Sequence, residues 1–317
     1  MEVLSQYKKF NIKKAFFSFL IAFAIFYFLL SKINIKNVIE TILHSDVRLL
    51  IFASLIYYIG FFFKSLRWKI LIGNIGLEVK LPRVYEIYFL GQFINSILPG
   101  RIGDFYRAHL IKKDYGLARS KVIGTIFIEK LADLSFILIF LVISAFLVFG
   151  ANIPKGFREI IIILGTLLVI IALISIVLIN NLRVKWISLF PKRLQLMYKN
   201  FLEAYSESIN FKTFPLFLLC TLLLWFFEFL MFFLVTISIR LKLNISLVIL
   251  IILVANLLLA LPLTPSGLGI VETGIAGVLI FVGVKNDIAV SVALLNNLVG
   301  YWNQLIFGFV AYLRSNR

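Results

Sequence analysis

Long apolar runs separated by short polar segments dominate the chain. A helix needs about 20 mostly apolar residues to cross roughly 30 Å of hydrocarbon. The run 49–63 is the shortest, and we expect it to extend past Lys64, whose aliphatic stem can carry the amine to the membrane surface. The pattern predicts an all-α polytopic membrane protein with about six full spans, at residues 15–30, 49–63, 122–149, 159–180, 213–239 and 286–313.

Two further apolar stretches are interrupted by helix-breaking residues. Residues 84–98 end at Pro99-Gly100, and residues 245–261 end at Pro262, with Pro265 close behind. A helix that breaks inside hydrocarbon leaves backbone groups unpaired, which is tolerated only where protein or a water-filled cavity surrounds them. We therefore predict two broken or re-entrant helical hairpins, the alternative being two ordinary spans that end in ordinary loops.

The basic residues are distributed unevenly between the polar segments. Lys8, Lys9, Lys13 and Lys14 precede the first run, and no small-residue cleavage site follows it, so we interpret the run as a retained span. With both termini inside, 23 of the 32 Lys and Arg residues fall in cytoplasmic segments and 8 in external ones. Because cytoplasmic loops are enriched in Lys and Arg, this bias predicts N-in and C-in.

The order of elements suggests an inverted internal repeat. Pro99-Gly-Arg-Ile-Gly103 and Pro265-Ser-Gly-Leu-Gly269 share the pattern Pro-x-x-[Ile/Leu]-Gly at an offset of 166 residues. The flanking spans begin at an offset of 164 residues. We predict one transmembrane domain over 1–317 with repeat halves 1–150 and 151–317, an arrangement typical of transporters.

Composition excludes several classes of protein. Apolar residues make up 62% of the 317 residues, charged residues only 15%, and the mean hydropathy is +1.03. These values exclude a soluble enzyme and a disordered chain. The net charge of +17 is scattered among the spans, which indicates anionic lipid headgroups and not nucleic acid as partners. A single cysteine, Cys220, and two separated histidines, His44 and His109, predict neither a disulfide nor a zinc site, and we expect no cofactor.

Glu228 is the most informative ionisable residue. It lies about 22 Å into the run that begins at Thr213, counting 1.5 Å per residue. An ionisable group at the bilayer centre costs at least about 2.5–3.5 kcal/mol, so it should face a partner or a cavity. The alternative is a protonated Glu228 that only packs against a neighbouring helix.

Three ionisable residues enter the third span together. Glu129 and Asp133 share a helix face, and Lys130 and Asp133 are spaced to pair. They are candidates for a polar pathway. The alternative is interfacial anchoring, with residues 131–149 spanning the membrane alone.

The first broken hairpin carries Asn95, Pro99, Arg101, Gly103, Asp104 and Arg107. If a helix follows Gly103, Asp104 lies at its positive N-terminal end. Arginine binds phosphate with two donors at once, so Arg101 and Arg107 could clasp a lipid phosphate while Asp104 orients them. The alternative is a basic cytoplasmic loop.

The second hairpin supplies hydroxyls, free backbone groups and one carboxylate. Asn256 lies in its first limb, Thr264 and Ser266 flank Pro265, and Glu272 begins the return helix after Gly267 and Gly269. Broken backbone of this kind can line a polar pocket. The alternative is a structural turn.

Two other segments have interfacial character. Arg67-Trp68 follows the second span, where Trp belongs at the membrane surface and Arg can be a topology signal. Residues 181–212 carry six Lys and Arg with apolar residues between them, which predicts an amphipathic element along the inner surface.

These motifs together resemble the lysylphosphatidylglycerol synthase transmembrane family, which includes the flippase half of the bacterial multiple peptide resistance factor. The resemblance covers nearly the whole chain and rests on motifs around Arg67, Asn95–Arg107, Glu129–Asp133 and Pro262–Glu272. It implies a lipid-translocating domain whose motif residues line a headgroup cavity. From their positions in the spans, we expect Glu228 and Asn256 to line it as well. The soluble aminoacyl-transferase domain of the resistance factor has no counterpart here, so we expect no enzyme activity.

The function that these observations favour is a flippase-like transporter of an anionic or phosphate-bearing lipid in the cell membrane. A polyprenol-dependent glycosyltransferase is a second hypothesis, although the external segment 32–48 has only Glu40 and Asp46 as acidic residues and no Asp-x-Asp. A non-catalytic partner of a separate lipid-modifying enzyme is a third. A homo-oligomer is left open.

Overall fold

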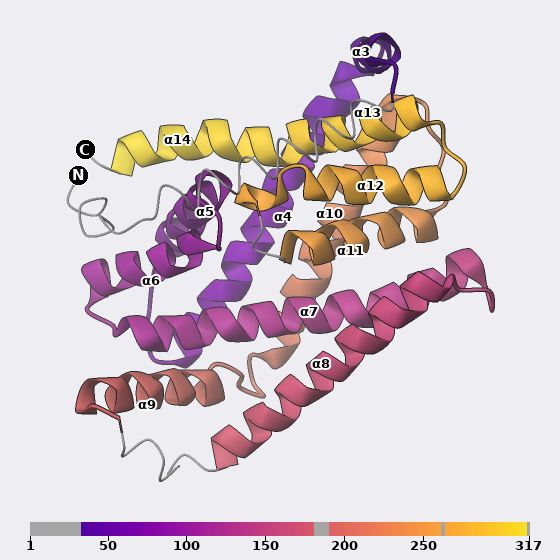
Figure 1. The fold of residues 1–317 in the computed structure, drawn as a ribbon. Helices are drawn as coiled ribbons and strands as arrows, with labels where there is room; N and C mark the ends of the chain where they lie inside the picture. The colour runs from indigo at the N-terminus through magenta and orange to yellow at the C-terminus, as the bar shows by residue number, and fades with distance from the viewer. Residues whose placement is uncertain (1–32, 181–189, 261–263, 316–317) are drawn as a thin grey trace.

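The computed structural model describes residues 33–180, 190–260 and 264–315, and within these ranges the chain is helical, without strands. Figure 1 shows the helices gathered into one bundle. In chain order the elements are α3 (Ile35–Leu43), α4 (Val47–Asn74), α5 (Leu81–Ile97), α6 (Ile102–Tyr115), α7 (Arg119–Phe149), α8 (Lys155–Asn180), α9 (Lys192–Glu207), α10 (Phe214–Ser238), α11 (Ile245–Ala260), η2 (Pro265–Gly267), α12 (Ile270–Phe281), α13 (Asn286–Asn297), η3 (Leu298–Trp302) and α14 (Asn303–Ser315).

The all-α prediction is confirmed. In the part of the chain that the structure describes, α4, α7 and α10 are each long and apolar enough to cross a membrane. α4 continues through Lys64 to Asn74, as expected, because no helix breaker interrupts it. The predicted span 286–313 is divided between α13 and α14 by one π-helical turn, η3. The first predicted span, 15–30, lies outside the described residues.

The loops gather at two opposite ends of the bundle. At one end, Asn34 and Asn37 hydrogen-bond to Asp287, and the backbone N–H of Asp46 donates to Ser238. At the other end, the Asn74 side chain donates to the Ser208 carbonyl, α9 packs on α7, and α14 ends (Figure 1). α9 lies within the segment 181–212, which the sequence predicts to be amphipathic, and two of its residues, Leu202 and Ala204, are buried.

The two predicted hairpins enter from these opposite ends and meet in the interior. α5 and α6 pack together as one hairpin, and α11 and α12 as the other (Figure 1). The Arg101 Nη2 of the first turn donates at 3.1 Å to the carbonyl of Leu259, near the end of α11 in the second hairpin. Of the described residues of the second turn, 264–269, most are buried, whereas Gly100 in the first turn is exposed, so the first interruption is only partly enclosed by protein.

The two turns share an unusual backbone. Gly100 and Arg101 have φ of 80° and 52°, and Ser266 and Gly267 have φ of 44° and 70°. Consecutive left-handed residues therefore follow the proline in both turns, with glycine first in one and second in the other. The non-glycine members, Arg101 and Ser266, carry a conformational cost that the surrounding packing has to offset.

Glycines let the helices of the first hairpin approach closely. A Cβ on Gly103 would lie 1.7 Å from the Gly91 carbonyl oxygen, and one on Gly91 would lie 2.5 Å from the Arg107 Cγ. Small residues serve this purpose in membranes, where van der Waals packing and not hydrophobic burial joins helices.

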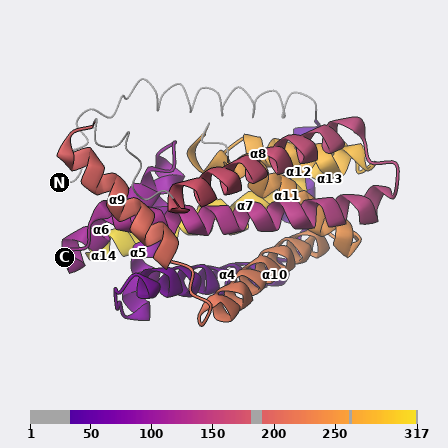
Figure 2. The same cartoon turned by 90° about the horizontal axis from the view of Figure 1, so that it is seen from below.

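α4 and α10 lie side by side along one side of the bundle (Figure 2). Their contacts join positions that are 164 residues apart. Lys64 pairs with Glu228 at this separation, and Phe63 stacks on Phe227 at the same separation, with ring centroids 5.5 Å apart. Such contacts are expected where repeat-related positions meet on a two-fold axis.

Candidate functional site

Six ionisable side chains from α4, α6 and α7 form one interior group, which we call the charge cluster. Three are basic and three acidic, so the cluster is formally neutral. Its two arginines and its glutamate are only 0–1% exposed. The members are Arg67, Asp104, Arg107, Glu129, Lys130 and Asp133.

Arg107 and Glu129 form the centre of the charge cluster. The Arg107 Nη2 donates to the Glu129 carboxylate at 2.8 Å, and the Tyr88 hydroxyl donates to the same carboxylate at 2.7 Å. The Arg107 guanidinium lies 4.0 Å from the ring centroids of both Trp68 and Tyr88. These contacts enclose both charges, so Glu129 is not an interfacial anchor.

Arg67 forms the second buried pair. Its Nη1 and Nη2 donate to the two Asp133 carboxylate oxygens at 2.6 and 3.1 Å. Trp68 is fully buried, and its indole N–H donates to the Thr125 hydroxyl. The expected interfacial place for Arg67-Trp68 is therefore wrong: α4 continues, and the packing of α7 against it turns both side chains inward.

Lys130 takes different partners from those expected. Its amine lies 3.8 Å from Asp104 and 3.6 Å from Glu129, while Asp133 is taken by Arg67. Helical spacing allowed the Lys130–Asp133 pair, but arginine offers the two-pronged geometry that a carboxylate prefers. Asp104 does lie in the first turn of α6 and within 3.5 Å of Arg107, as predicted.

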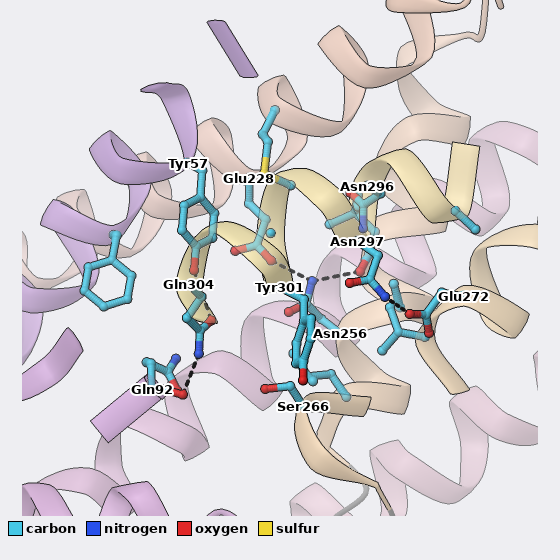
Figure 3. Close-up of a pocket in the computed structure, with 18 of the residues that line it drawn as sticks. Tyr57, Gln92, Glu228, Asn256, Ser266, Glu272, Asn296, Asn297, Tyr301 and Gln304 are labelled. Atoms are coloured by element: carbon cyan, nitrogen blue, oxygen red, sulfur yellow. Dashed lines mark hydrogen bonds between the residues drawn. The ribbon is translucent and has the colours of Figure 1, made fainter. Parts of the chain in front are cut away.

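Glu228 has partners from two other helices. The Lys64 amine donates to its carboxylate at 2.8 Å, and the Asn256 amide donates to its other oxygen at 2.9 Å (Figure 3). The expectation that Glu228 faces a partner or a cavity is met. The expectation for Lys64 was wrong, because its amine turns to Glu228 and not to the membrane surface. We call Lys64, Glu228 and Asn256 the central bridge.

Two cavities adjoin the central bridge, and all three of its residues line both of them. The first, the charged cavity, has a volume of about 320 Å³ and is also lined by Arg101, Lys130 and Asp133. The second, the amide cavity, has a volume of about 160 Å³. Its other polar lining residues are Tyr57, Gln92, Ser266, Glu272, Asn296, Asn297, Tyr301 and Gln304 (Figure 3).

A smaller pocket of about 80 Å³ lies between the two hairpin turns. Asn95, Arg101, Thr264 and Ser266 contribute to its lining. The Asn95 side chain accepts from the Gly103 N–H at 2.7 Å, which caps the start of α6. The predicted turn residues are thus adjacent, with Pro265 buried and Pro99 half-buried.

Arg101 and Arg107 differ in what they can bind. The Arg101 guanidinium donates to the Leu259 carbonyl and lines the charged cavity and the turn pocket. Arg107 is enclosed by Glu129, Trp68 and Tyr88 and lines none of these three spaces. In this conformation a phosphate therefore reaches Arg101 and not Arg107.

Glu272 stands at the start of α12, as predicted. Its carboxylate accepts from the Gly269 N–H at 2.7 Å and from the Asn297 amide. Among the described residues its side chain is in no ion pair, although it is only 3% exposed.

Sequence reasoning missed several lining residues. The Tyr57 hydroxyl donates to Gln304, whose amide donates to the Gln92 carbonyl and to the Ser96 hydroxyl. Asn296 and Asn297 are also new. A signal was present, since four amide side chains interrupt the apolar run 286–313, and polar residues inside spans usually face a bundle interior.

The described residues include no group of three or more His, Cys, Asp or Glu side chains placed to hold a metal ion. Cys220 is buried in α10 as a free thiol.

Comparison with known proteins identifies relatives across the whole bundle. A family model described as the lysylphosphatidylglycerol synthase TM region matches residues 15–308. A UPF0104 membrane protein of Methanocaldococcus jannaschii is 34% identical over 222 residues, which cover 70% of this chain and 93% of the relative. A UPF0104 membrane protein of Pyrococcus horikoshii is 23% identical over 314 residues, which cover 90% of this chain and 92% of that relative.

Proposed function

Because this chain belongs to the lysylphosphatidylglycerol synthase transmembrane family, we propose that it moves an anionic or phosphate-bearing lipid between the two leaflets of a membrane. One observation carries the proposal: two broken hairpins enter from opposite ends, and their turns meet beside polar cavities, with Arg101 Nη2 3.1 Å from the Leu259 carbonyl. Transporters use broken helices in this way to place substrate near the bilayer midplane.

The proposal includes a topology. The chain crosses the cell membrane several times with both termini inside, and the end that carries α9 and the C-terminus of α14 is cytoplasmic. The excess of Lys and Arg in the segments at that end supports this orientation. The first hairpin then opens to the inside and the second to the outside.

The proposal also includes an inverted repeat, with halves 1–150 and 151–317. Two observations support it: the matched left-handed turns, and the contacts between α4 and α10 at a separation of 164 residues. The Lys64–Glu228 pair would lie on the pseudo-two-fold axis, which in an inverted repeat runs in the membrane plane.

The lipid phosphate would bind in the charged cavity. Lys64, Arg101 and Lys130 line it with two carboxylates, Asp133 and Glu228, so its charged lining has a net charge of +1. An anionic headgroup would bind there while the acyl chains stay in the surrounding lipid. The Arg101 guanidinium can offer two parallel N–H donors to a phosphate. In the structure it donates to the neutral Leu259 carbonyl, a hydrogen bond that can be broken at modest cost.

The central bridge separates the two cavities, so its opening would pass the headgroup from one to the other. Lys64 and Glu228 are 24% and 19% exposed, which makes this pair more accessible than the Arg107–Glu129 pair. Separating a partly solvated ion pair costs less free energy than separating a buried one, because water can solvate the freed charges. The central bridge is therefore the weaker barrier.

Reconstitution tests the proposal. Purified protein in liposomes would be assayed with fluorescent phosphatidylglycerol, an aminoacylated phosphatidylglycerol and a polyprenyl phosphate, using a membrane-impermeant quencher. We expect at least one of these lipids to cross faster than in protein-free liposomes. Arg101→Ala should slow that lipid about tenfold or more, as the loss of one charge-assisted contact implies. Arg193→Ala, an exposed arginine on α9, is the matched control.

The outcomes separate the competing functions. Equal rates with and without protein for all three lipid classes would remove the transport proposal. A non-catalytic partner protein should tolerate both Arg101→Ala and Glu228→Gln at normal expression, whereas a transporter should tolerate neither.

A further inference from the structure

The amide cavity contains a buried carboxyl group that lacks a basic partner. Glu272 is 3% exposed, and its hydrogen bonds come from a backbone N–H and the neutral Asn297 amide. The nearest charge-neutralising influence is the N-terminus of α12, which is partial. Other interior carboxylates of the described chain, Glu129 and Glu228, each have an Arg or Lys within 2.8 Å.

Two amide oxygen atoms without hydrogen-bond partners belong to residues that line the same cavity as this carboxylate. The Oδ1 atoms of Asn296 and Asn297 are buried and accept no hydrogen bond, and both residues line the amide cavity together with Glu272. Figure 3 shows Asn297 between Asn256 and Glu272, with its amide nitrogen toward Glu272. A buried acceptor without a donor is costly, and an ion or water is a usual explanation.

The local helix geometry is also irregular at this point. The π-helical turn Leu298–Trp302 follows directly after Asn296 and Asn297 and shifts the register between α13 and α14. Single π turns inside α-helices are frequent at functional sites. Asn296 and Asn297 are the last two residues of α13, directly before this turn, and both line the amide cavity.

We propose that Glu272, Asn296 and Asn297 form a binding site for a monovalent metal cation, with Na⁺ as the ion. The donors are all oxygen atoms, which suit hard cations. One carboxylate with neutral amide oxygens balances a single positive charge, whereas Ca²⁺ sites normally use several carboxylates and Mg²⁺ sites keep several waters in octahedral geometry. Na⁺ sites beside broken helices near the membrane midplane are typical of ion-coupled transporters.

The site adjoins the central bridge. Glu228 and Asn256 line the same cavity, so a cation at Glu272 would add positive charge close to the Lys64–Glu228 pair. Bound Na⁺ would thereby weaken the hold of Lys64 on its partner and favour opening of the bridge. This coupling step rests on the proposed lipid transport, but cation binding itself does not.

Ion binding can be measured on the purified full chain without any lipid substrate. Thermal unfolding in detergent would be followed in NaCl, KCl and choline chloride at one ionic strength, together with equilibrium binding of ²²Na⁺. Because a ligand that binds only the folded state raises Tm by mass action, we expect Tm to increase with Na⁺ concentration and not with choline, and we expect ²²Na⁺ binding to saturate.

Three variants locate the site. Glu272→Gln should abolish ²²Na⁺ binding and the Na⁺-dependent rise in Tm, while the Tm in choline stays near that of the wild type. Asn296→Ala should weaken Na⁺ affinity about tenfold, as the loss of one neutral ligand implies. This second variant tests the site even if Glu272→Gln folds poorly. Glu159→Gln, in an exposed ion pair on α8, should leave Na⁺ binding unchanged.

Two outcomes of these measurements would overturn the proposal. These are equal Tm in all three salts, and a Na⁺ response that survives both cavity variants. A response to acid alone would show a proton at Glu272 instead of Na⁺, and a response to ethanolamine but not Na⁺ would show an ammonium site. Lipid transport without Na⁺ dependence, in the presence of normal ²²Na⁺ binding, would reject only the coupling step.

Discussion

Both hairpins lie beside buried ionisable side chains, but the partners of these side chains differ between the two regions. Beside the first hairpin, three basic and three acidic side chains pair with one another, and its central residues, Arg107 and Glu129, are 0–1% exposed. Beside the second hairpin, the carboxylate of Glu272 has only neutral partners, and neighbouring oxygens accept no hydrogen bond. The formal charges of the first region are paired, although the buried Nε atoms of Arg67 and Arg107 have no hydrogen-bond partner, and the second region has a carboxyl group without a basic partner and unused acceptors.

This difference assigns separate roles to the two regions. A fully paired network rigidifies the structure that contains it, because breaking any member leaves a buried charge without a partner. An incompletely satisfied cavity is stabilised when a ligand arrives. We infer that the charge cluster holds the first hairpin in place, while the second hairpin provides the responsive surface.

Replacing glutamate by glutamine in each region should give the largest difference in stability and is the most direct test of this comparison. Glu129→Gln leaves the buried Arg107 with only the more distant Asp104, at 3.5 Å, as a counter-charge, and should lower the free energy of unfolding by about 3–5 kcal/mol. Glu272→Gln removes a buried charge without a basic partner, so the effect should stay within about 1 kcal/mol. Reversible unfolding in mixed detergent measures both. Equal losses would mean that the regions do not differ as we describe.

Close packing of the hairpins gives the next largest effect. Gly103→Ala should lower stability by about 3 kcal/mol, because its Cβ would meet the Gly91 backbone oxygen at 1.7 Å and backbone cannot move aside. Gly274→Ala in α12 meets the Leu258 Cδ1 at 2.3 Å, the flexible end of a side chain, and should cost about 1 kcal/mol. A Tm series on the two variants tests the order, which a larger loss for Gly274→Ala would reverse.

The central bridge can be tested by exchanging its charges. Lys64→Met should cost about 1–2 kcal/mol, less than for the charge cluster, because the pair is partly exposed. If these positions are related by a two-fold axis, the double variant Lys64→Glu/Glu228→Lys should regain most of the lost stability. Unfolding of the single and double variants measures the coupling, and additive losses would argue against a direct pair.

We expect the smallest change in stability at Gly277 of α12, which serves as the baseline for the comparison. A Cβ on Gly277 of α12 would meet no atom within 4 Å, and the residue lies inside a regular helix. Gly277→Ala should therefore raise stability by about 0.5–1 kcal/mol through lower chain entropy. A loss of stability in the same unfolding assay would show an unrecognised neighbour of this helix.

Sequence reasoning succeeded where local rules act. Apolar length predicted the long helices α4, α7 and α10, and the Pro-Gly pattern predicted interruptions near Pro99 and Pro265. Helix spacing also predicted the Asp104–Arg107 contact. It failed for Trp68, Lys64 and the partner of Lys130. The sequence offers a local explanation for each of these side chains, but in the structure each contacts a residue of another helix: Trp68 contacts Thr125, Lys64 contacts Glu228, and Lys130 contacts Asp104.

By itself, the sequence determined that this is a helical membrane protein with two broken hairpins, because apolar length, proline and glycine act on the backbone within a few residues. Only the tertiary structure decided which charges neutralise one another and where empty volume remains. The reason is physical: Arg67 and Asp133, Arg107 and Glu129, and Lys64 and Glu228 come from different helices, and their pairing depends on the crossing of those helices and not on any local spacing.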